Sequence, residues 1–452
     1  MFSRVLVANR GEIAVRVVRA LHELGIEAVA VYSTADQEAL HVELADHAVR
    51  IGPPASAASY LDISNVVAAA ETTGCEALHP GYGFLAENAA LVRACEDSSI
   101  VFIGPTADVM ERMGDKVQAK HELRAAGVPL VPGSDGAARV VEARVVGDEA
   151  GYPILLKALA GGGGKGMRTV ESADELEGAY AAASAEAEAA FGNGVLYVEK
   201  VVSPARHVEV QVLCDAEGGV LTLGERECSV QRRHQKLIEE SPSAALDDEA
   251  REELESATER ACRAIGYRNA GTFEFLVGPD GGFHFIEVNC RLQVEHPVSE
   301  LVTGIDVVRE QIRIAAGGTL EHTGRALRRG HAIEIRINAE DPRRGFVPAP
   351  GTVTRFRPPL GAGVRVDTSV REGGVIPPYY DSLIAKVIVW DETRPEAITR
   401  ARRVLAELEI EGIPTTRELA RDVLDSREFR SGEYSTSTLD ELMDRLPSLV
   451  PS

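Results

Sequence analysis

Two acidic residues are spaced so that they could hold a metal ion. Glu274 and Glu287 lie in GTFEFLVGPDGGFHFIEVN, where two alternating segments flank Asp280-Gly281, a strong signal for a hairpin. A symmetric hairpin about this turn places the two carboxylates directly opposite each other, with Asn289 on the same face. Because facing carboxylates repel unless a cation lies between them, this set favours Mg²⁺ or Mn²⁺, with substrate phosphates completing the shell. The alternative is a solvated sheet face in which a bulge offsets the pair.

A row of polar residues continues from this hairpin. In EVNCRLQVEHPVSE the side chains of Arg291, Gln293 and Glu295 follow Asn289 at every second position, which predicts one face of an extended segment. We interpret the row as the floor of a site, with the arginine as a forked donor for an oxyanion and Glu295 as a general base. A surface ladder of ion pairs is the alternative.

Two further segments place histidines beside charged or amide groups. In ECSVQRRHQKLIEE, strand spacing predicts that His234 and Lys236 share a face, so that both point at an anion. In ARHVEVQVL, His207 alternates in the same way with Glu209 and Gln211. For either histidine alone, a structural role is the simpler interpretation.

Lysine is scarce in this chain, and its positions point to an anion site. A lysine supplies a compact, rotatable charge that can follow a transferring phosphate, which a rigid guanidinium does less well. Chance retention is the alternative, and Lys120, in a helix-like run, is the best candidate for a bystander. Against 41 arginines, the seven lysines are Lys116, Lys120, Lys157, Lys165, Lys200, Lys236 and Lys386.

The glycine-rich segment AGGGGKGM could bring backbone N–H groups close to phosphates. It is not a P-loop, because Gly166 follows Lys165 where a serine or threonine should supply the metal hydroxyl. We interpret it as a mobile hairpin lid that closes over a triphosphate, with a plain turn as the alternative. Lys157 and Lys200, on the flanking strands, could hold the phosphates, and the backbone of residues 199–202 could meet an adenine edge.

The predicted elements place these residues in several units. Strands at 4–8, 27–33, 77–80 and 100–104, with a helix at 11–24, predict a parallel α/β sheet with ligands near the strand carboxyl ends. The first turn, ANRGEIA, does not have the dinucleotide-binding glycine pattern. One helix is predicted from about 107 to 130. Residues 131–201 form a small unit of strands and a helix at 172–190, and hairpin strands with helices at 246–265 and 395–408 follow.

Composition limits the class of protein. The formal net charge of −22 argues against nucleic acid and anionic membranes as partners. Six cysteines without a C-x-x-C pair are typical of a reducing compartment and argue against a zinc or disulfide framework. The amino-terminal MFSRVLVANRGE has no apolar h-region, and no run of residues is long enough to span a membrane. We therefore expect a cytoplasmic protein.

With these segments described, the chain resembles biotin carboxylase of the ATP-grasp superfamily over nearly its whole length. The resemblance rests on VLVANRGEIA, HPGYGFLAENA, MGDK, LLKALAGGGGKGM, EKVV, ECSVQRRHQK, TFEFL, EVNCRLQVEHPVSE, AIEIRINAEDP and PPYYDSLIAK. It implies an α/β and α+β, ATP-grasp fold with an N-terminal Rossmann-like domain, a small lid domain and a C-terminal β-rich domain. The implied boundaries are 1–113 for the N-terminal domain, 114–202 for linker helices and lid (the lid at about 131–202), 203–330 for the ATP-grasp core and 331–446 for the C-terminal domain.

The resemblance also implies roles for individual residues. ATP would contact Lys116, Lys157, Gly163, Gly164, Glu199, Lys200, Val202, His207 and His234, as well as Glu274 and Glu287. The metal would be held by Glu274, Glu287 and Asn289. Bicarbonate would lie against Lys236, Arg291, Gln293 and the Val294 backbone, with Glu295 as base. Arg336, together with Arg291, would bind biotin at its ureido oxygen, and we expect Asp381 and Lys386 to be supporting only.

The implied reaction has two stages. Bicarbonate, held by Lys236 and Arg291 and deprotonated by Glu295, attacks the γ-phosphate to give carboxyphosphate, which breaks down to CO₂ and phosphate in a site closed to water. The freed phosphate takes the biotin N1′ proton, and Arg336 stabilises the ureido anion that attacks CO₂. Two departures from the family are visible: Cys290 stands where threonine is common, and Ala160 replaces a glycine at the start of the lid loop.

The resemblance places biotin on a carrier protein, normally within Met-Lys-Met. No lysine follows Lys386 and that tripeptide is absent, so we expect the carrier to be another polypeptide and this chain to be free-standing and homodimeric. Its reaction would be the first half-reaction of acetyl-CoA or a related acyl-CoA carboxylase, as in fatty acid biosynthesis, and the second partner would be a carboxyltransferase subunit. The final acceptor (acetyl-CoA, propionyl-CoA or pyruvate) belongs to that partner.

Two rival functions remain. Another ATP-grasp enzyme, such as a carbamoyl-phosphate synthetase half or a purine-pathway ligase, would share the ATP and metal groups but lack the RLQVEHP row and the IRINAED arginine. A catalytically silent nucleotide-binding scaffold would have lost some of Glu274, Glu287, Arg291 and Glu295, and all four are present.

Overall fold

The computed structural model describes residues 1–159 and 167–449. Gly163, Gly164 and Lys165 of the predicted lid loop, and Ala160 before them, lie outside the described residues. Among the described residues, no helix has both the length and the apolar character needed to cross a bilayer.

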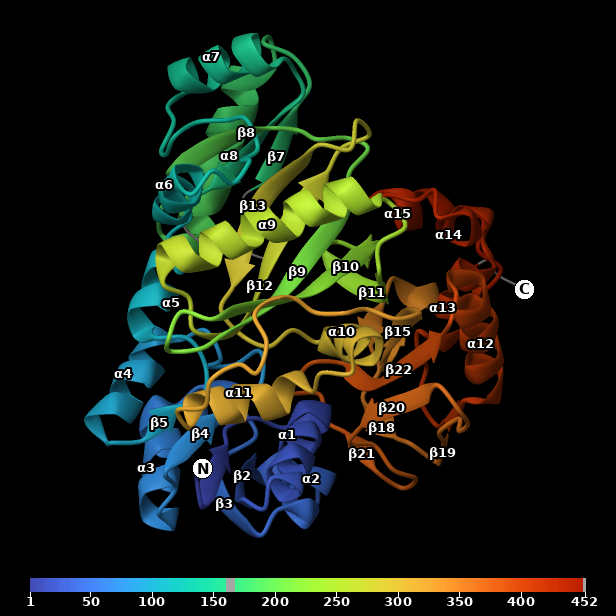
Figure 1. Ribbon diagram of the computed structural model, residues 1–452. Coiled ribbons are helices and arrows are strands. Elements are labelled where there is room, and N and C mark those ends of the chain that lie inside the picture. Colours follow the sequence, from blue (N-terminus) through green and yellow to red (C-terminus); the bar gives the residue numbers. More distant parts are fainter. Residues whose placement is uncertain (160–166, 450–452) are drawn as a thin grey trace.

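The N-terminal domain is built on a five-stranded parallel sheet in the order β3-β2-β1-β4-β5 (Figure 1). The predicted parallel sheet is confirmed, but one strand, β3, was missed, because its polar and largely exposed residues lack the apolar run that marks the others. The elements are β1 (Arg4–Val7), α1 (Gly11–Glu23), β2 (Glu27–Ser33), η1 (Thr34–Asp36), α2 (Leu40–Leu44), β3 (His47–Gly52), η2 (Ser56–Ala58), α3 (Ile63–Thr73), β4 (Ala77–His79), α4 (Ala89–Asp97) and β5 (Val101–Phe102).

The helix predicted from 107 to 130 is two helices, α5 (Ala107–Gly114) and α6 (Lys116–Ala125). Asp115 separates them: its extended backbone ends α5, and its carboxylate accepts hydrogen bonds from the N–H groups of Val117 and Gln118 at 2.9 and 3.0 Å. The single-helix prediction was wrong because it overlooked this N-cap. The break places Lys116 at the first position of α6.

A small three-stranded sheet, in the order β7-β6-β8, forms a unit with its own apolar core at one end of the molecule (Figure 1). Strands β6 and β7 are antiparallel neighbours, as the predicted hairpin requires. The elements are α7 (Val140–Ala150), β6 (Ile154–Ala158), β7 (Met167–Val170), α8 (Leu176–Phe191) and β8 (Leu196–Lys200).

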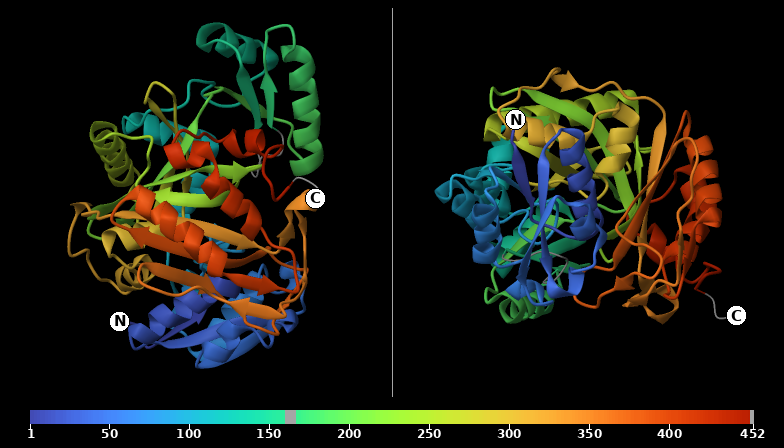
Figure 2. Two further views of the ribbon diagram at one scale, coloured as in Figure 1. Left: turned by 90° about the vertical axis from the view of Figure 1, so that its right-hand side faces the viewer. Right: turned by 90° about the horizontal axis from the view of Figure 1, so that it is seen from below.

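A long, mostly antiparallel sheet occupies the centre, in the order β13-β12-β9-β10-β11-β15-β22-β20, with β14 beside β10. It continues from β11 to β15 without interruption, so segments from both sides of residue 330 belong to one sheet. Helix α9 packs against β9 and β10, and the C-terminal helices, red in Figure 2, line one flank of the molecule, with the N-terminal domain, in blue, below the central sheet.

The elements of this part run from residue 206 to residue 442. They are β9 (Arg206–Cys214), β10 (Val220–Arg232), β11 (Gln235–Ser241), α9 (Asp248–Ile265), β12 (Asn269–Val277), β13 (Phe283–Asn289), α10 (His296–Thr303), α11 (Val307–Ala315), β14 (Gly324–Arg325), β15 (His331–Asn338), β16 (Glu340–Asp341), η3 (Pro342–Arg344), β17 (Val347–Pro348), β18 (Gly351–Thr352), β19 (Arg355–Arg357), β20 (Val364–Thr368), β21 (Val375–Ile376), β22 (Leu383–Asp391), α12 (Arg394–Glu407), β23 (Glu409–Glu411), α13 (Arg417–Asp425), α14 (Arg427–Ser431) and α15 (Thr438–Leu442).

Two strand predictions near the site were wrong. His234 does not share a strand face with Lys236, because β10 and β11 are joined by a two-residue turn, Arg233-His234, with φ angles of 48° and 65°. The extended row also stops early: β13 ends at Asn289, and α10 begins seven residues later with a proline in its first turn.

Candidate active site

The predicted pairing of Glu274 with Glu287 is confirmed: the two residues are direct partners across β12 and β13, next to a register shift. Glu274 is buried and Glu287 is exposed. The protein groups around the Glu287 carboxylate displace water from it, which raises its pKa, and the negative charge of Glu274 raises this pKa further. A cation between the two oxygens would relieve this repulsion, so the pair fits the hard-oxygen set that Mg²⁺ or Mn²⁺ prefers.

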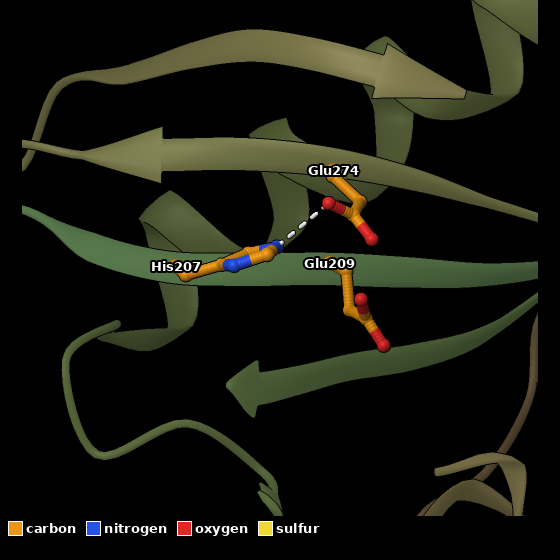
Figure 3. A group of neighbouring side chains, drawn as sticks. All are labelled: His207, Glu209 and Glu274. Atoms are coloured by element: carbon orange, nitrogen blue, oxygen red, sulfur yellow. Dashed lines mark ion pairs between the residues drawn. The ribbon is translucent and has the colours of Figure 1, made fainter. Parts of the chain in front are cut away.

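Two further groups contact the buried carboxylate of Glu274. His207 Nε2 lies 2.9 Å from Oε2, and Figure 3 shows the ring reaching from β9 toward Glu274 with Glu209 beside it. Asn289 Nδ2 donates to Oε1 at 2.9 Å. Burial acts to lower the pKa of His207, but Glu274 raises it above its ordinary value. As a metal ligand, Asn289 would have to turn its amide so that the oxygen faces the ion.

The Lys236 side chain contacts three carboxylates of the candidate site. Its ammonium donates to Glu209 at 2.6 Å, to Glu274 at 3.2 Å and to Glu295 at 2.5 Å. Burial would lower its pKa, but the acidic groups around it, including Cys228 and the three carboxylates, raise it well above the ordinary value. These carboxylates come close enough to His207 or Cys228 to suggest a metal. The Lys236 ammonium lies nearest to Glu209 and Glu295, at 2.6 and 2.5 Å, and more loosely at 3.2 Å to Glu274, whose strand partner is Glu287.

Glu295 is fully buried between two cations. One oxygen accepts from Lys236, and the other accepts from Arg336 Nη2 at 2.9 Å. Although burial acts to raise it, Lys236 and Arg336 hold the pKa of Glu295 well below its ordinary range. At rest this carboxylate is therefore ionised and a weak base. Weakening of either ion pair would raise the pKa of Glu295 and make it a stronger base.

The polar row predicted beyond Asn289 is brought together even though the strand stops. Arg291 donates to Asn289 Oδ1 at 2.9 Å and to Gln293 Oε1 at 2.8 Å, and Gln293 donates to Glu274 at 3.2 Å. Arg291 Nε also donates at 2.9 Å to Glu87, a residue of the N-terminal domain that the sequence analysis missed. No spacing signal linked Glu87 to a segment some two hundred positions away.

Arg336 and Lys386 lie side by side on β15 and β22. Arg336 Nε donates to Glu239 at 2.5 Å. Lys386 is fully buried, and its ammonium donates to the Val294 carbonyl at 2.9 Å and lies 3.1 Å from Glu12 of α1. Lys386 thus braces the segment that carries Glu295, whereas Asp381 is exposed and accepts a hydrogen bond from the N–H of Leu383.

A buried arginine on β10 was also missed. Arg226 is fully buried and donates to Glu209 at 2.5 Å and to Gln211 at 2.7 Å, so it fixes the acidic residue that contacts Lys236. The alternation of HVEVQV placed Glu209 and Gln211 correctly on one face with His207. A complementary cation on the neighbouring strand could have been sought from that alternation.

A second group of cations lies between α6 and the small sheet. Glu199 on β8 forms ion pairs with Lys120 and with Lys157, and the Tyr197 ring lies 4.4 Å from the Lys120 ammonium. Lys120, for which a bystander role was expected, therefore lies in this group beside Lys157. Helix α6 turns Lys120, one turn after Lys116, toward the small sheet. Burial lowers the pKa of both Lys116 and Lys120, and Glu287 acts on Lys116 in the opposite direction.

The side chains of Lys200 and His234 do not lie where the sequence predicted them. Lys200 donates to the carbonyls of Gly151 and Tyr152 at 2.9 and 3.0 Å, on the opposite face of β8 from Glu199, so its side chain does not face the phosphate site predicted for it. Its backbone and Val202 follow Glu199 along the chain. His234 is exposed in the turn between β10 and β11.

Comparisons with known proteins agree along the whole chain. Three family models match in order: "Biotin carboxylase, N-terminal domain" at residues 1–110, "Carbamoyl-phosphate synthase L chain, ATP binding domain" at 115–323, and "Biotin carboxylase C-terminal domain" at 334–441.

The relatives include a biotin carboxylase of Nostoc, 52% identical over 98% of this chain and 99% of its own, and biotin carboxylase 1 of Bacillus subtilis, 51% identical over 97% and 98%. A biotin carboxylase structure from Campylobacter jejuni has a TM-score of 0.94 at 47% identity, covering 98% of this chain and 99% of that one. The biotin carboxylase domain dimer of the Hydrogenobacter thermophilus 2-oxoglutarate carboxylase, solved with MgADP and bicarbonate, has a TM-score of 0.94 at 48% identity and covers 100% and 99%.

Proposed function

Because this chain belongs to the biotin carboxylase family of ATP-dependent ligases, we propose that its site uses ATP and bicarbonate to carboxylate biotin on a separate carrier protein. The products are ADP, phosphate and carboxybiotin on the carrier. One observation carries the proposal for the site: a buried carboxylate, Glu295, lies between Lys236 and Arg336 and beside the paired Glu274 and Glu287. This arrangement joins a base, an anion site and a metal site.

ATP is assigned to the space between the small sheet and the central sheet. Lys116, Lys120 and Lys157 supply positive charge there, and the Glu199 and Val202 backbone would meet the adenine. We retain Gly163, Gly164, Lys200, His207 and His234 as ATP contacts, with Lys200 acting through its backbone. The metal, Mg²⁺ or Mn²⁺, would be held by Glu274, Glu287 and Asn289, where it would neutralise phosphate charge.

Bicarbonate is assigned to Lys236, Arg291, Gln293 and the Val294 backbone. When the anion enters, Lys236 and Arg291 turn part of their charge to it and away from the protein carboxylates. Glu295 then loses part of the stabilisation that keeps its pKa low and can accept the bicarbonate proton. The bicarbonate oxygen attacks the γ-phosphate, and the O–P bond to ADP breaks, giving carboxyphosphate.

Carboxyphosphate decomposes to CO₂ and phosphate next to Arg336. We assign Arg336, with Arg291, to the ureido oxygen of biotin, whose N1′ proton passes to the freed phosphate. The biotin nitrogen then attacks CO₂ while the guanidinium stabilises charge on the ureido oxygen. Glu239 and Glu295 hold Arg336 on both sides, so its orientation is fixed before biotin arrives.

The partners belong to the same proposal. A separate carrier is supported by the relatives named biotin carboxylase, which this chain matches over nearly their whole length, and a homodimer by the dimeric domain of the Hydrogenobacter relative. A carboxyltransferase subunit would use the carboxybiotin. Six free, buried cysteines support the expectation of a cytoplasmic location.

We retain 1–113, 114–202, 203–330 and 331–446 as the domain boundaries.

The test is ATP cleavage with bicarbonate, measured with and without free biotin. Biotin-dependent release of ADP with carboxybiotin as product is the expected result. Turnover that needs an amine or amino-acid acceptor and ignores biotin would instead support another ATP-grasp ligase, the alternative suggested by the central family model.

A further inference from the structure

Four arginines form a basic rim on this acidic protein. They are Arg232 and Arg233, at the end of β10 and in the following turn, and Arg343 and Arg344, in η3. Arg233, Arg343 and Arg344 are exposed, and Arg232 is partly buried. In a chain with a formal net charge of −22, such a gathering of positive charge from two separate loops requires an explanation.

Packing joins the two loops into one surface. The Arg232 guanidinium lies 3.9 Å from the centre of the ring of Phe346, which is two residues after η3. Arg343 Nε donates to the Ser448 carbonyl at 2.9 Å, which orients that loop without neutralising its charge. The rim is therefore a defined surface held by contacts within the chain.

The charge of the rim is largely uncompensated. Among residues 1–159 and 167–449, none of the four arginines forms an ion pair, whereas the exposed Arg329 and Arg371 each pair with a glutamate. Asp440 and Glu340 are more distant negative neighbours of Arg232. Burial, and then the positive charge of Arg233, lower the pKa of Arg232.

A small cleft adjoins this rim and borders the proposed site at Lys236. Arg232 and Phe346 line it together with Gln235, Lys236 and Asn338. Lys236 is the lysine that contacts Glu295, and Asn338 lies two residues after Arg336 on β15. The rim therefore lies close to the groups that we assign to bicarbonate and biotin.

We propose that the four rim arginines are the docking surface for an acidic face of the biotinylated carrier, which brings its biotinyl-lysine arm in beside the cleft. This inference rests on the proposed function. A biotin held on another polypeptide must enter from an open side, and the rim borders a cleft that reaches Lys236. Uncompensated arginines steer an anionic partner and fix its orientation, mainly by raising the rate of association.

The experiment compares two substrates, free biotin and a purified biotinylated carrier domain of acidic net charge. Arg343→Glu/Arg344→Glu reverses two rim charges at residues that neither line the cleft nor contact the proposed catalytic groups. At low ionic strength we expect kcat/KM for the carrier to fall about tenfold or more, with kcat/KM for free biotin unchanged. The loss should shrink as salt is added, because screening weakens the same attraction in the unmodified protein.

Matched variants separate docking from general effects of charge. Arg50→Glu/Arg93→Glu makes the same change in net charge at two exposed arginines of the N-terminal domain and should leave both substrates unaffected. Arg232→Gln/Arg233→Gln should reproduce the selective loss on the carrier. The inference is overturned if the rim variants leave the carrier reaction unchanged, or if they slow both substrates equally. If the unmodified protein carboxylates neither substrate, the proposed function itself fails.

Discussion

Two carboxylates in this protein each lie between two cations, and they differ in the charge that surrounds them. Glu199, at the small sheet, pairs with Lys120 and Lys157, and no second carboxylate shares these lysines among the described residues. Glu295, at the central sheet, pairs with Lys236 and Arg336. Those two cations are also shared with other buried carboxylates, at Glu209, Glu239 and Glu274.

This difference indicates a division of work. The Glu199 group keeps an excess of positive charge, which suits it to hold phosphates. In the Glu295 group each cation is already committed to several carboxylates, so a small anion entering there changes the balance of charge around the base. In the proposed function, the first group attracts the nucleotide phosphates and the second controls the bicarbonate proton.

The largest expected effect is at the second group. Glu295→Gln keeps the shape of the side chain but removes the base, so we expect kcat for bicarbonate-dependent ATP cleavage to fall by about 1,000-fold. Binding of MgATP, measured by calorimetry, should change little, because Glu295 does not belong to the group that we assign to the phosphates. A variant with weakened nucleotide binding and nearly normal kcat would reverse the assignments of the two groups.

Arg336 gives the next largest effect. We expect Arg336→Ala to lower biotin carboxylation by about 100-fold, because the ureido charge loses its guanidinium, while nucleotide binding is retained. Comparison of carboxybiotin formation with the nucleotide dissociation constant measures both. Loss of ATP affinity as the main effect would show that Arg336 does not have the role assigned to it.

The sequence predicted the second group better than the first. The hairpin signal at Asp280-Gly281 was enough to pair Glu274 with Glu287, because local turn geometry sets the register. The contact between Lys120 and Glu199 could not be predicted, because it depends on how α6 packs against β8, between segments some eighty residues apart. The contacts of Glu87 and Arg226 are likewise set by tertiary packing, and the role of Arg336 came from family resemblance alone.

The lysines of the first group should act on ATP binding. Lys157→Met removes one of the two cations that contact Glu199, and we expect the KM for ATP to rise about tenfold with the KM for bicarbonate unchanged. Lys200→Met is the matched control, because that side chain bonds backbone carbonyls on the opposite face. Steady-state kinetics of both variants, with circular dichroism to check folding, decides the point. An equal rise in both variants would contradict the separation of the two faces.

The smallest effect on activity is expected at Glu240, next to Glu239 but on the other face of β11. Glu240 contacts His331 and Arg394, and these groups overcome burial to lower its pKa to about 2. A carboxylate with a lowered folded-state pKa adds stability above its unfolded pKa of about 4.5, and this stability is lost as pH falls toward 2.

We therefore expect Glu240→Gln to lower the free energy of unfolding by about 3 kcal/mol at pH 7 with little change in kcat. Denaturant melts at several pH values should show the difference from the unmodified protein shrinking below about pH 4.5. A difference that stays constant down to pH 2 would argue against the ionised pair.

The account's central claim is that bicarbonate itself attacks ATP at the Glu295 group. The most direct measurement uses bicarbonate labelled with ¹⁸O, in the presence of ATP, metal and biotin, and determines the isotope content of the released phosphate. The account predicts one ¹⁸O atom transferred from bicarbonate to each phosphate formed. Phosphate whose new oxygen comes from water, in a reaction that still forms carboxybiotin, would contradict it.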